Sequence, residues 1–103
     1  MTQITVQHCE TMAEVRAHID ALDARIVPLL AERGGYVAQA ARIKQHIDQV
    51  YDQARIDFIV DRVKAMARAE GAPEAVIEAT YRAMIDAFIA FERAHFQQLR
   101  QGA

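Results

Sequence analysis

The sequence contains no serine and a single cysteine among its 103 residues. The missing serine excludes a serine nucleophile as the basis of catalysis. Cys9 has no partner for a disulfide within the chain, which favours a reducing compartment. The N-terminal residues lack the basic start and apolar run of a signal peptide, and no segment reaches the roughly 18 consecutive apolar residues of a membrane span. We therefore expect a cytoplasmic protein without a membrane partner.

Charge and histidine spacing argue against two further classes of site. The formal net charge of −2 gives no overall attraction to nucleic acid, and the sequence has neither a basic stripe nor an aromatic platform. The four histidines show no metal-ligand spacing and no HExxH motif. We predict no metal site and no nucleic-acid partner, so any anion site must come from a local cluster of cations.

Apolar residues recur with helical spacing along almost the whole chain. The composition, 52% apolar and 25% charged, is that of an ordinary globular protein. No segment alternates with the period of a strand. The periodicity predicts three helices, at about 12–45, 52–70 and 73–99. A short loop at about 46–51 separates the first two. The sequence therefore predicts one all-α domain over residues 1–103, in which residues 1–10 form a loose N-terminal arm.

The same spacing gives the apolar sets of the second and third helices. For the second helix the apolar set is Ile56, Ile59, Val60, Val63 and Met66. For the third it is Val76, Ile77, Tyr81, Met84, Ile85, Phe88, Ile89, Phe96 and Leu99. Gly71 is expected to end the second helix, and Pro73 fits the first turn of the third helix.

The first helix begins with a capping box and contains an internal proline. Thr11 is the expected N-cap, and Glu14 is expected to reach back to it. Pro28 should remove one backbone hydrogen bond and bend the helix. Two helices, broken at Pro28 or at Gly34-Gly35, are the alternative. We favour one long kinked helix, because no polar turn cluster separates the two halves.

The predicted helix lengths do not fit a compact monomer. A helix of about 33 residues is about 50 Å long, whereas a compact domain of about 100 residues has a radius of gyration of only about 13 Å. Long amphipathic helices bury their surplus apolar face against a partner. We therefore predict an intertwined homodimer.

The segment AERGGYVAQAARIK, residues 31–44, places two long cations on one face of the first helix. Arg33 and Lys44 lie roughly 16 Å apart along the axis and could grip the two ends of a small dianion. Arg16 is about 25 Å from Arg33, so it could join the same ligand only from the partner of an antiparallel dimer. The alternative is a set of unrelated cations in solvent. Gly34-Gly35 lack bulk, which would permit close approach of a partner helix or of the substrate's surroundings.

Glu92 falls on the apolar stripe of the third helix. Tyr81, Ile85, Phe88 and Phe96 share that stripe at helical spacing. Burying a carboxylate there is unfavourable unless it is paired or neutralised. The alternative is a glutamate at the edge of the stripe, with its carboxylate in water.

Taken together, these residues resemble the all-α chorismate mutase family from Met12 to about Phe96. The segments that carry the resemblance are MAEVRAHIDALDARIVPLLAERGGYVAQAARIK, VYDQAR and IDAFIAFE. The VRxxIDxLDxxIxxLLxER pattern is followed by a lysine eleven residues after its last arginine. The resemblance implies a three-helix intertwined dimer with two sites, each completed by the partner.

Carried over by position, the resemblance implies catalytic roles for Arg33, Lys44 and Glu92. Arg16 would come from the partner chain and would bind a substrate carboxylate together with Arg33. Lys44 would contact a carboxylate and the ether oxygen, while Asp52 and Arg55 would lie around the ring hydroxyl and the neighbouring carboxylate. The full set of implied substrate-binding residues is Arg16, Arg33, Lys44, Asp52, Arg55, Ile56, Phe88 and Glu92.

The implied reaction is the cofactor-free rearrangement of chorismate to prephenate in aromatic amino-acid biosynthesis. Many members of the family have glutamine at the position equivalent to Glu92. At the position equivalent to Ile56, a bacterial mutase has glutamate. The aliphatic side chain of Ile56 is a feature in which the chain also resembles isochorismate pyruvate lyase. That enzyme would make salicylate and pyruvate from isochorismate, and a mutase of aminated chorismate is a further relative.

A helical dimerisation module without catalysis is the alternative from a different class. Glu92 could assist catalysis only as the neutral acid, and its protonation state is left open.

Overall fold

The structure, a computed structural model, describes residues 4–101. Its compact units are Met1–Tyr36 and Val37–Ala103. The elements in chain order are α1 (Met12–Ile43), the short 3₁₀ helix η1 (Ile47–Gln49), α2 (Gln53–Glu70) and α3 (Glu74–Gln101). No strand occurs within residues 4–101, so the predicted all-α class is confirmed. The predicted loop at 46–51 contains η1, which the sequence did not predict.

The capping of α1 differs in one bond from the predicted capping box. The hydroxyl of Thr11 accepts a hydrogen bond from the backbone N–H of Glu14 at 3.2 Å, as predicted. The carboxylate of Glu14 instead accepts from the N–H of Glu10 at 3.1 Å. Both bonds satisfy N–H groups that precede or open the helix. The start of α1 is therefore capped from both directions.

A single helix passes through Pro28 and Gly34-Gly35. The structure assigns α1 as one element from Met12 to Ile43, so the alternative of two separate helices is wrong. The bend at Pro28 stays a prediction. An added Cβ on Gly35 would meet no atom within 4 Å among the neighbouring side chains and elements described. Packing within the first unit therefore gives no reason for a glycine at this position.

Local sequence accounts for both ends of α2. The carboxylate of Asp52 caps its start by accepting from the N–H of Arg55 at 3.0 Å. Gly71 ends it with a positive φ of 70°, a conformation that costs other L-residues more than glycine. The N–H of Gly71 bonds to the carbonyl of Arg68, and the N–H of Ala72 bonds to that of Ala67 at 2.8 Å. This pair of bonds is a Schellman motif, and it confirms Gly71 as the helix-ending residue.

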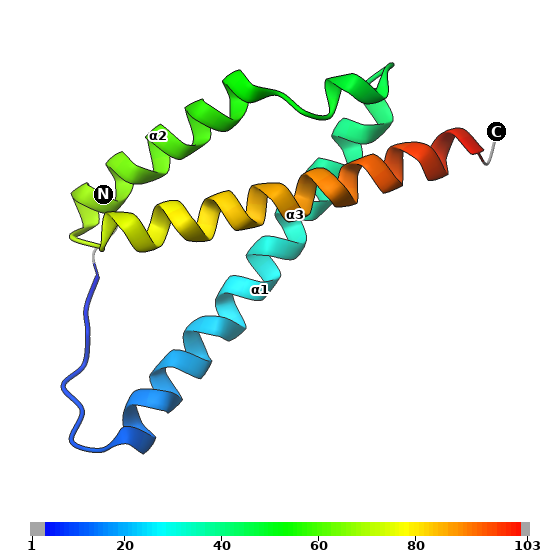
Figure 1. Ribbon diagram of the computed structural model, residues 1–103. Coiled ribbons are helices and arrows are strands. Elements are labelled where there is room, and N and C mark those ends of the chain that lie inside the picture. The colour runs from blue at the N-terminus through cyan, green and yellow to red at the C-terminus, as the bar shows by residue number, and fades with distance from the viewer. Residues whose placement is uncertain (1–3, 102–103) are drawn as a thin grey trace. The chain divides into compact units, whose positions relative to one another are not determined.

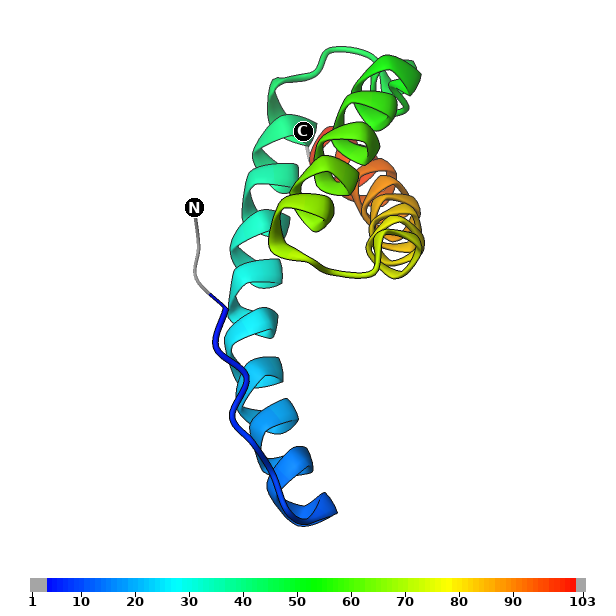
Figure 2. The ribbon, with the colours of Figure 1, turned by 90° about the vertical axis from the view of Figure 1, so that its left-hand side faces the viewer.

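Within the second unit, α2 and α3 run antiparallel and side by side (Figures 1 and 2). Their facing sides, with the end of α1 and the residue after η1, form a small core. Its buried apolar residues are Ala41, Val50, Val60, Val63, Ala67, Ile85 and Phe96. Met66, Val76 and Leu99 belong to the apolar sets of these helices but are exposed within the chain. Ala67 lies on the buried stripe in place of Met66, because Val60, Val63 and Ala67 continue the helical spacing better.

Ion pairs join the two helices near their connection. Arg68 pairs with Glu74 at 2.7 Å, while Glu78 pairs with Lys64 at 3.4 Å and with Arg82 at 2.9 Å. The hydrogen bond from Arg82 holds the pKa of Glu78 below its ordinary value. A lowered pKa favours the charged carboxylate, so this contribution is present above the ordinary pKa and is lost as the pH falls. Such exposed pairs contribute little to stability.

The N-terminal part of α1 leaves its apolar side chains exposed. Four apolar residues that recur here at helical spacing are between 47% and 64% exposed within the chain: Ile19, Leu22, Ile26 and Leu29. A contiguous apolar stripe of this kind marks a surface for association. No helix within residues 4–101 is long and apolar enough to cross a membrane.

Replacing Gly71 by alanine should lower the free energy of unfolding by about 1–2 kcal/mol, because alanine is strained at this positive φ. Gly71→Asn should lose less, since asparagine tolerates the left-handed conformation better. Urea unfolding at one fixed protein concentration measures both variants. Equal stability of Gly71→Ala and the unmodified chain would contradict the assigned conformation.

Candidate active site

The residues predicted to bind substrate divide between the two units. Arg16 and Arg33 lie on α1 in the first unit, where Arg16 is exposed and Arg33 is half-buried. Lys44, Asp52, Arg55, Ile56, Phe88 and Glu92 lie in the second unit. The clearest polar cluster of the second unit forms around Lys44 and Glu92.

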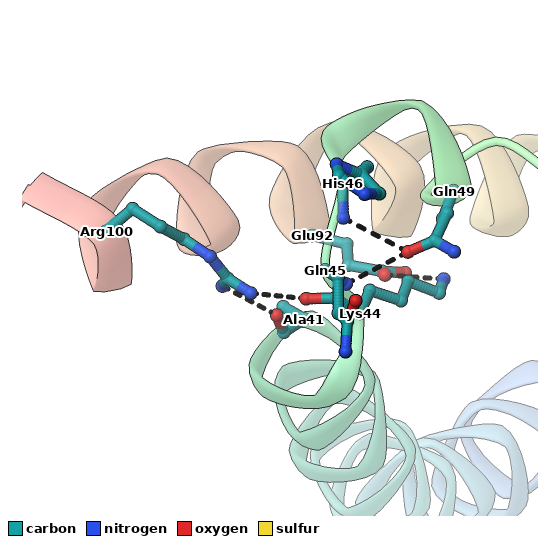
Figure 3. A network of polar contacts seen from close by, with 7 residues as sticks. All are labelled: Ala41, Lys44, Gln45, His46, Gln49, Glu92 and Arg100. Atoms are coloured by element: carbon teal, nitrogen blue, oxygen red, sulfur yellow. Dashed lines mark hydrogen bonds and ion pairs between the residues drawn. The ribbon is translucent and has the colours of Figure 1, made fainter.

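Lys44 and Glu92 form an ion pair between the end of α1 and the middle of α3 (Figure 3). The ammonium nitrogen Nζ of Lys44 lies 2.7 Å from Oε2 of Glu92. Side-chain exposure is 28% for Lys44 and 9% for Glu92, so the carboxylate is largely shielded from water. A charge-assisted bond of this length strengthens as water is excluded. The pair brings together two of the predicted catalytic residues.

Glu92 lies on the buried stripe of α3, as the helical spacing predicted. Ile85 and Phe96 are buried on the same stripe, one seven residues before and the other four residues after Glu92. The alternative, a glutamate that turns its carboxylate into water, is wrong. A buried carboxylate requires a compensating partner, and Lys44 supplies the cation.

The backbone that carries Lys44 is held on its C-terminal side by Gln49. The side-chain oxygen of Gln49 accepts hydrogen bonds from the N–H groups of Gln45 at 2.9 Å and His46 at 3.1 Å. Figure 3 shows this amide turned back over the connection. Val50, which follows η1, is buried and anchors the other end of the segment. The turn after Lys44 is therefore closed by its own side chains.

Arg100, which the sequence analysis missed, holds the same backbone from α3. Its guanidinium donates to the carbonyl of Ala41 at 2.8 Å and to the carbonyl of Lys44 (Figure 3). It also lies over the ring of Phe96, 3.6 Å from the ring centroid. The last carbonyls of a helix lack partners within the helix and attract cations. The sequence offered one signal, a cation four residues after a buried aromatic, but not the segment that it would meet.

The other predicted residues of the second unit have local roles in the structure. The carboxylate of Asp52 caps α2, and the guanidinium of Arg55 lies 5.3 Å from the centroid of the Phe58 ring. Ile56 and Phe88 are half-buried, and the ring of Phe88 meets that of Phe91 edge to face at 6.3 Å. The cap role of Asp52 follows from its position directly before the helix, a signal that the sequence analysis did not use.

The Lys44–Glu92 pair can interact with an anion in a defined way. The ammonium group has three donors, and Glu92 occupies one of them. The others can meet an oxygen that becomes negatively charged. Among residues 4–101, no group of three or more histidine, cysteine, aspartate or glutamate residues is placed to hold a metal ion. The geometry is that of an electrostatic site.

Comparison with known proteins places this cluster within a family. Residues 15–93, which include both Lys44 and Glu92, match the family described as chorismate mutase type II. The chain belongs to that family. The chain is also similar to a chorismate mutase of Methanocaldococcus jannaschii, with 26% identity over 90 residues, which covers 86% of this chain and 91% of the relative. The family resemblance predicted from the sequence, and with it the isomerase class, is confirmed.

In this chorismate mutase type II chain, Lys44→Ala should lower the free energy of unfolding by about 1–3 kcal/mol at neutral pH, because the buried Glu92 would lose its cation. Combining it with Glu92→Gln should recover part of the loss. Lys64→Ala is the matched control, since it removes a longer and more exposed pair with Glu78. Chemical denaturation measures all three variants. Equal losses for Lys44→Ala and Lys64→Ala would contradict the compensating role of Lys44.

Proposed function

We propose that the protein converts chorismate to prephenate, with Lys44 and Glu92 at the breaking ether bond. The observation that carries this proposal is the Lys44–Glu92 pair, whose carboxylate is buried, inside the segment that matches the family. The rearrangement breaks one C–O bond and forms one C–C bond within the same molecule, so it requires no nucleophile and no electron transfer. The protein needs only to hold the substrate and stabilise charge.

Two physical effects would supply the rate enhancement. Cations at both ends of the dianion hold it in a compact conformer, which keeps the reacting carbons close together. The ammonium group of Lys44 then stabilises the negative charge that develops on the ether oxygen as the C–O bond breaks. Because Lys44 is already fixed against α3, little reorganisation is needed at the moment of reaction.

Glu92 would contribute in its neutral form. A protonated carboxyl group donates a hydrogen bond to the ether oxygen, whereas a carboxylate would repel the charge that builds there. In the structure the Oε2 atom of Glu92 contacts Lys44, which leaves Oε1 as the atom available to carry a proton. We infer that the carboxyl group and the ammonium group act on the same oxygen of the substrate.

The remaining cations of the proposed site are Arg33 and the partner's Arg16. We propose an intertwined homodimer in which Arg16 of one chain completes the site that contains Lys44 of the other. The exposed apolar stripe of α1, which includes Ile19, Leu22 and Ile26, supports this assembly, because a second copy would cover it. Close approach of that copy would also explain Gly35, for which packing within the first unit offers no reason.

We also propose that residues 1–103 act as one domain within this dimer. Asp52, Arg55, Ile56 and Phe88 complete the proposed substrate surroundings, with the arginine facing a carboxylate. A cytoplasmic role in aromatic amino-acid biosynthesis follows from the proposed reaction and from the lone cysteine.

Ile56 favours a second candidate reaction. An aliphatic side chain at this position resembles isochorismate pyruvate lyase, which eliminates pyruvate from isochorismate and leaves salicylate. Ile56 is half-buried on α2, next to Arg55 in sequence, and has no polar group to bind a ring hydroxyl. The two reactions would use the same cations, so they differ in the substrate and not in the electrostatic site.

Separate incubation with chorismate and with isochorismate distinguishes the candidates. Prephenate, followed by its acid-catalysed conversion to phenylpyruvate, reports the mutase, and salicylate fluorescence reports the lyase. We expect faster turnover of chorismate. Turnover of isochorismate alone would replace the proposed reaction by the lyase, and turnover of neither would favour a helical dimerisation module.

Glu92→Gln should retain most of the kcat/KM, whereas Glu92→Ala should lower it by roughly 100-fold, because an amide can still donate a hydrogen bond to the ether oxygen and a methyl group cannot. Steady-state kinetics on both variants and on the unmodified protein test this prediction. Equal losses in the two variants would rule out a hydrogen bond from this side chain.

Mixing two inactive variants should restore activity if Arg16 acts across the dimer. Arg16→Ala and Lys44→Ala should each reduce kcat/KM by roughly 100-fold or more. A heterodimer of the two variants contains one intact site, so random exchange of chains should recover about a quarter of the unmodified activity. Mixing Lys44→Ala with Glu92→Ala is the control, because both residues belong to the same site of one chain. Recovery only in the first mixture is expected, and no recovery in either would contradict the shared site.

A further inference from the structure

We propose that Arg100 is a positioning residue for Lys44, an inference that rests on the proposed function of the Lys44–Glu92 pair. Arg100 has no place in the site implied by the sequence, and its guanidinium does not bond to Glu92. It acts on the main chain that carries Lys44 by donating to the carbonyls of Ala41 and Lys44. One planar group thereby joins the last turn of α1 to the residue that follows the helix.

The position of these carbonyls explains why arginine is suited to the task. Ala41 is fully buried, and its carbonyl is among the last four of α1, which have no partner within the helix. The carbonyl of Lys44 lies just beyond the helix end. A guanidinium presents several N–H donors in a rigid plane and can meet both acceptors at once, whereas an ammonium is a single point. The negative end of the helix dipole adds to the attraction.

Phe96 fixes the guanidinium in this place. It lies one helical turn before Arg100 on α3, and its ring is buried in the core of the second unit. The guanidinium carbon of Arg100 lies 3.6 Å from the centroid of that ring. Stacking on a buried ring limits the rotamers that the arginine can adopt. Arg100 is therefore held by the same helix that carries Glu92.

These contacts determine how the Lys44 ammonium is placed. Arg100 holds the Lys44 carbonyl, and the N–H of Lys44 bonds to the carbonyl of Ala40 at 2.9 Å. Gln49 holds the next two N–H groups of the chain. Both peptide groups that flank the Lys44 Cα are thus bonded, so its side chain starts from a fixed point. Loss of the Arg100 contacts would leave the second of these peptide groups held only by the side chain of Gln49.

The first test compares Arg100→Ala and Arg100→Lys with the unmodified protein in chorismate turnover. A displacement of about 1 Å at a catalytic group can cost up to roughly 100-fold, so we expect kcat to fall by roughly 10-fold to 100-fold in Arg100→Ala, with a smaller change in KM. Arg100→Lys keeps the positive charge but loses the planar group that meets both carbonyls at once, so it should recover only part of the lost kcat. Arg82→Ala, which removes another exposed arginine from α3, is the matched control and should retain normal kcat. Full activity of Arg100→Ala would overturn the proposal.

The second test repeats Arg100→Ala in a Lys44→Ala background. If Arg100 acts through the Lys44 side chain, it should cause no further loss of kcat once that side chain is absent. A loss of the same factor in both backgrounds would assign Arg100 to general stability or to direct contact with substrate, and would overturn the positioning role.

A third measurement separates failure of this proposal from failure of the proposed function. Hydrogen exchange of the free protein requires no substrate and follows the amides of Lys44, Gln45 and His46. In Arg100→Ala these amides should exchange at least 10-fold faster, while those of Val60 and Val63 stay unchanged. Unchanged exchange at Lys44 would overturn the positioning role whatever reaction the protein catalyses. Faster exchange without turnover of chorismate would leave the positioning role in place and reject only the reaction.

Discussion

The buried carboxylate of Glu92 is the constraint around which the second unit is built. A carboxylate removed from water is strongly unfavourable until a cation reaches it, and Lys44 reaches it from the end of another helix. Pairing the Glu92 carboxylate therefore requires that the residue directly after α1 lie against α3. The Gln49 and Arg100 contacts are arranged on the turn after Lys44. Structure and proposed chemistry share this one interaction, because the group that neutralises the carboxylate is also the proposed electrostatic catalyst.

Most of the fold was predictable from sequence because its signals are local. Helical spacing, the Thr11 cap and Gly71 each depend on neighbours within a few residues, and the structure agrees with them. The burial of Glu92 was predictable for the same reason, since a stripe position is a property of one helix. The apolar residues Met66 and Val76 are exposed within the chain, because each helix has more apolar residues than its packing partner covers. No local pattern tells which of two adjacent apolar residues faces the core.

The part of the site that sequence could not supply depends on contacts between distant segments. Arg100 resembles any other cation near a helix end until α3 is placed against the end of α1. Asp52 shows the opposite case, in which the resemblance suggested a ligand contact and the local structure shows an N-cap. A cap and a ligand contact are compatible, since a carboxylate has two oxygens. Lys44 and Glu92 were predictable individually, whereas the contact between them was a property of the fold.

The long separations within this cluster have a consequence for how the protein can change. Lys44 and Glu92 are 48 residues apart, and Ala41 and Arg100 are 59 apart. The entropy lost on closing a loop grows only with the logarithm of its length, so a doubling costs about 0.6 kcal/mol. Extra residues between Gly71 and Glu74 would therefore add little to the free energy of bringing these groups together. The connection between α2 and α3 is therefore free to vary in length. The residues that α3 places against the end of α1, in contrast, cannot change without loss of these contacts.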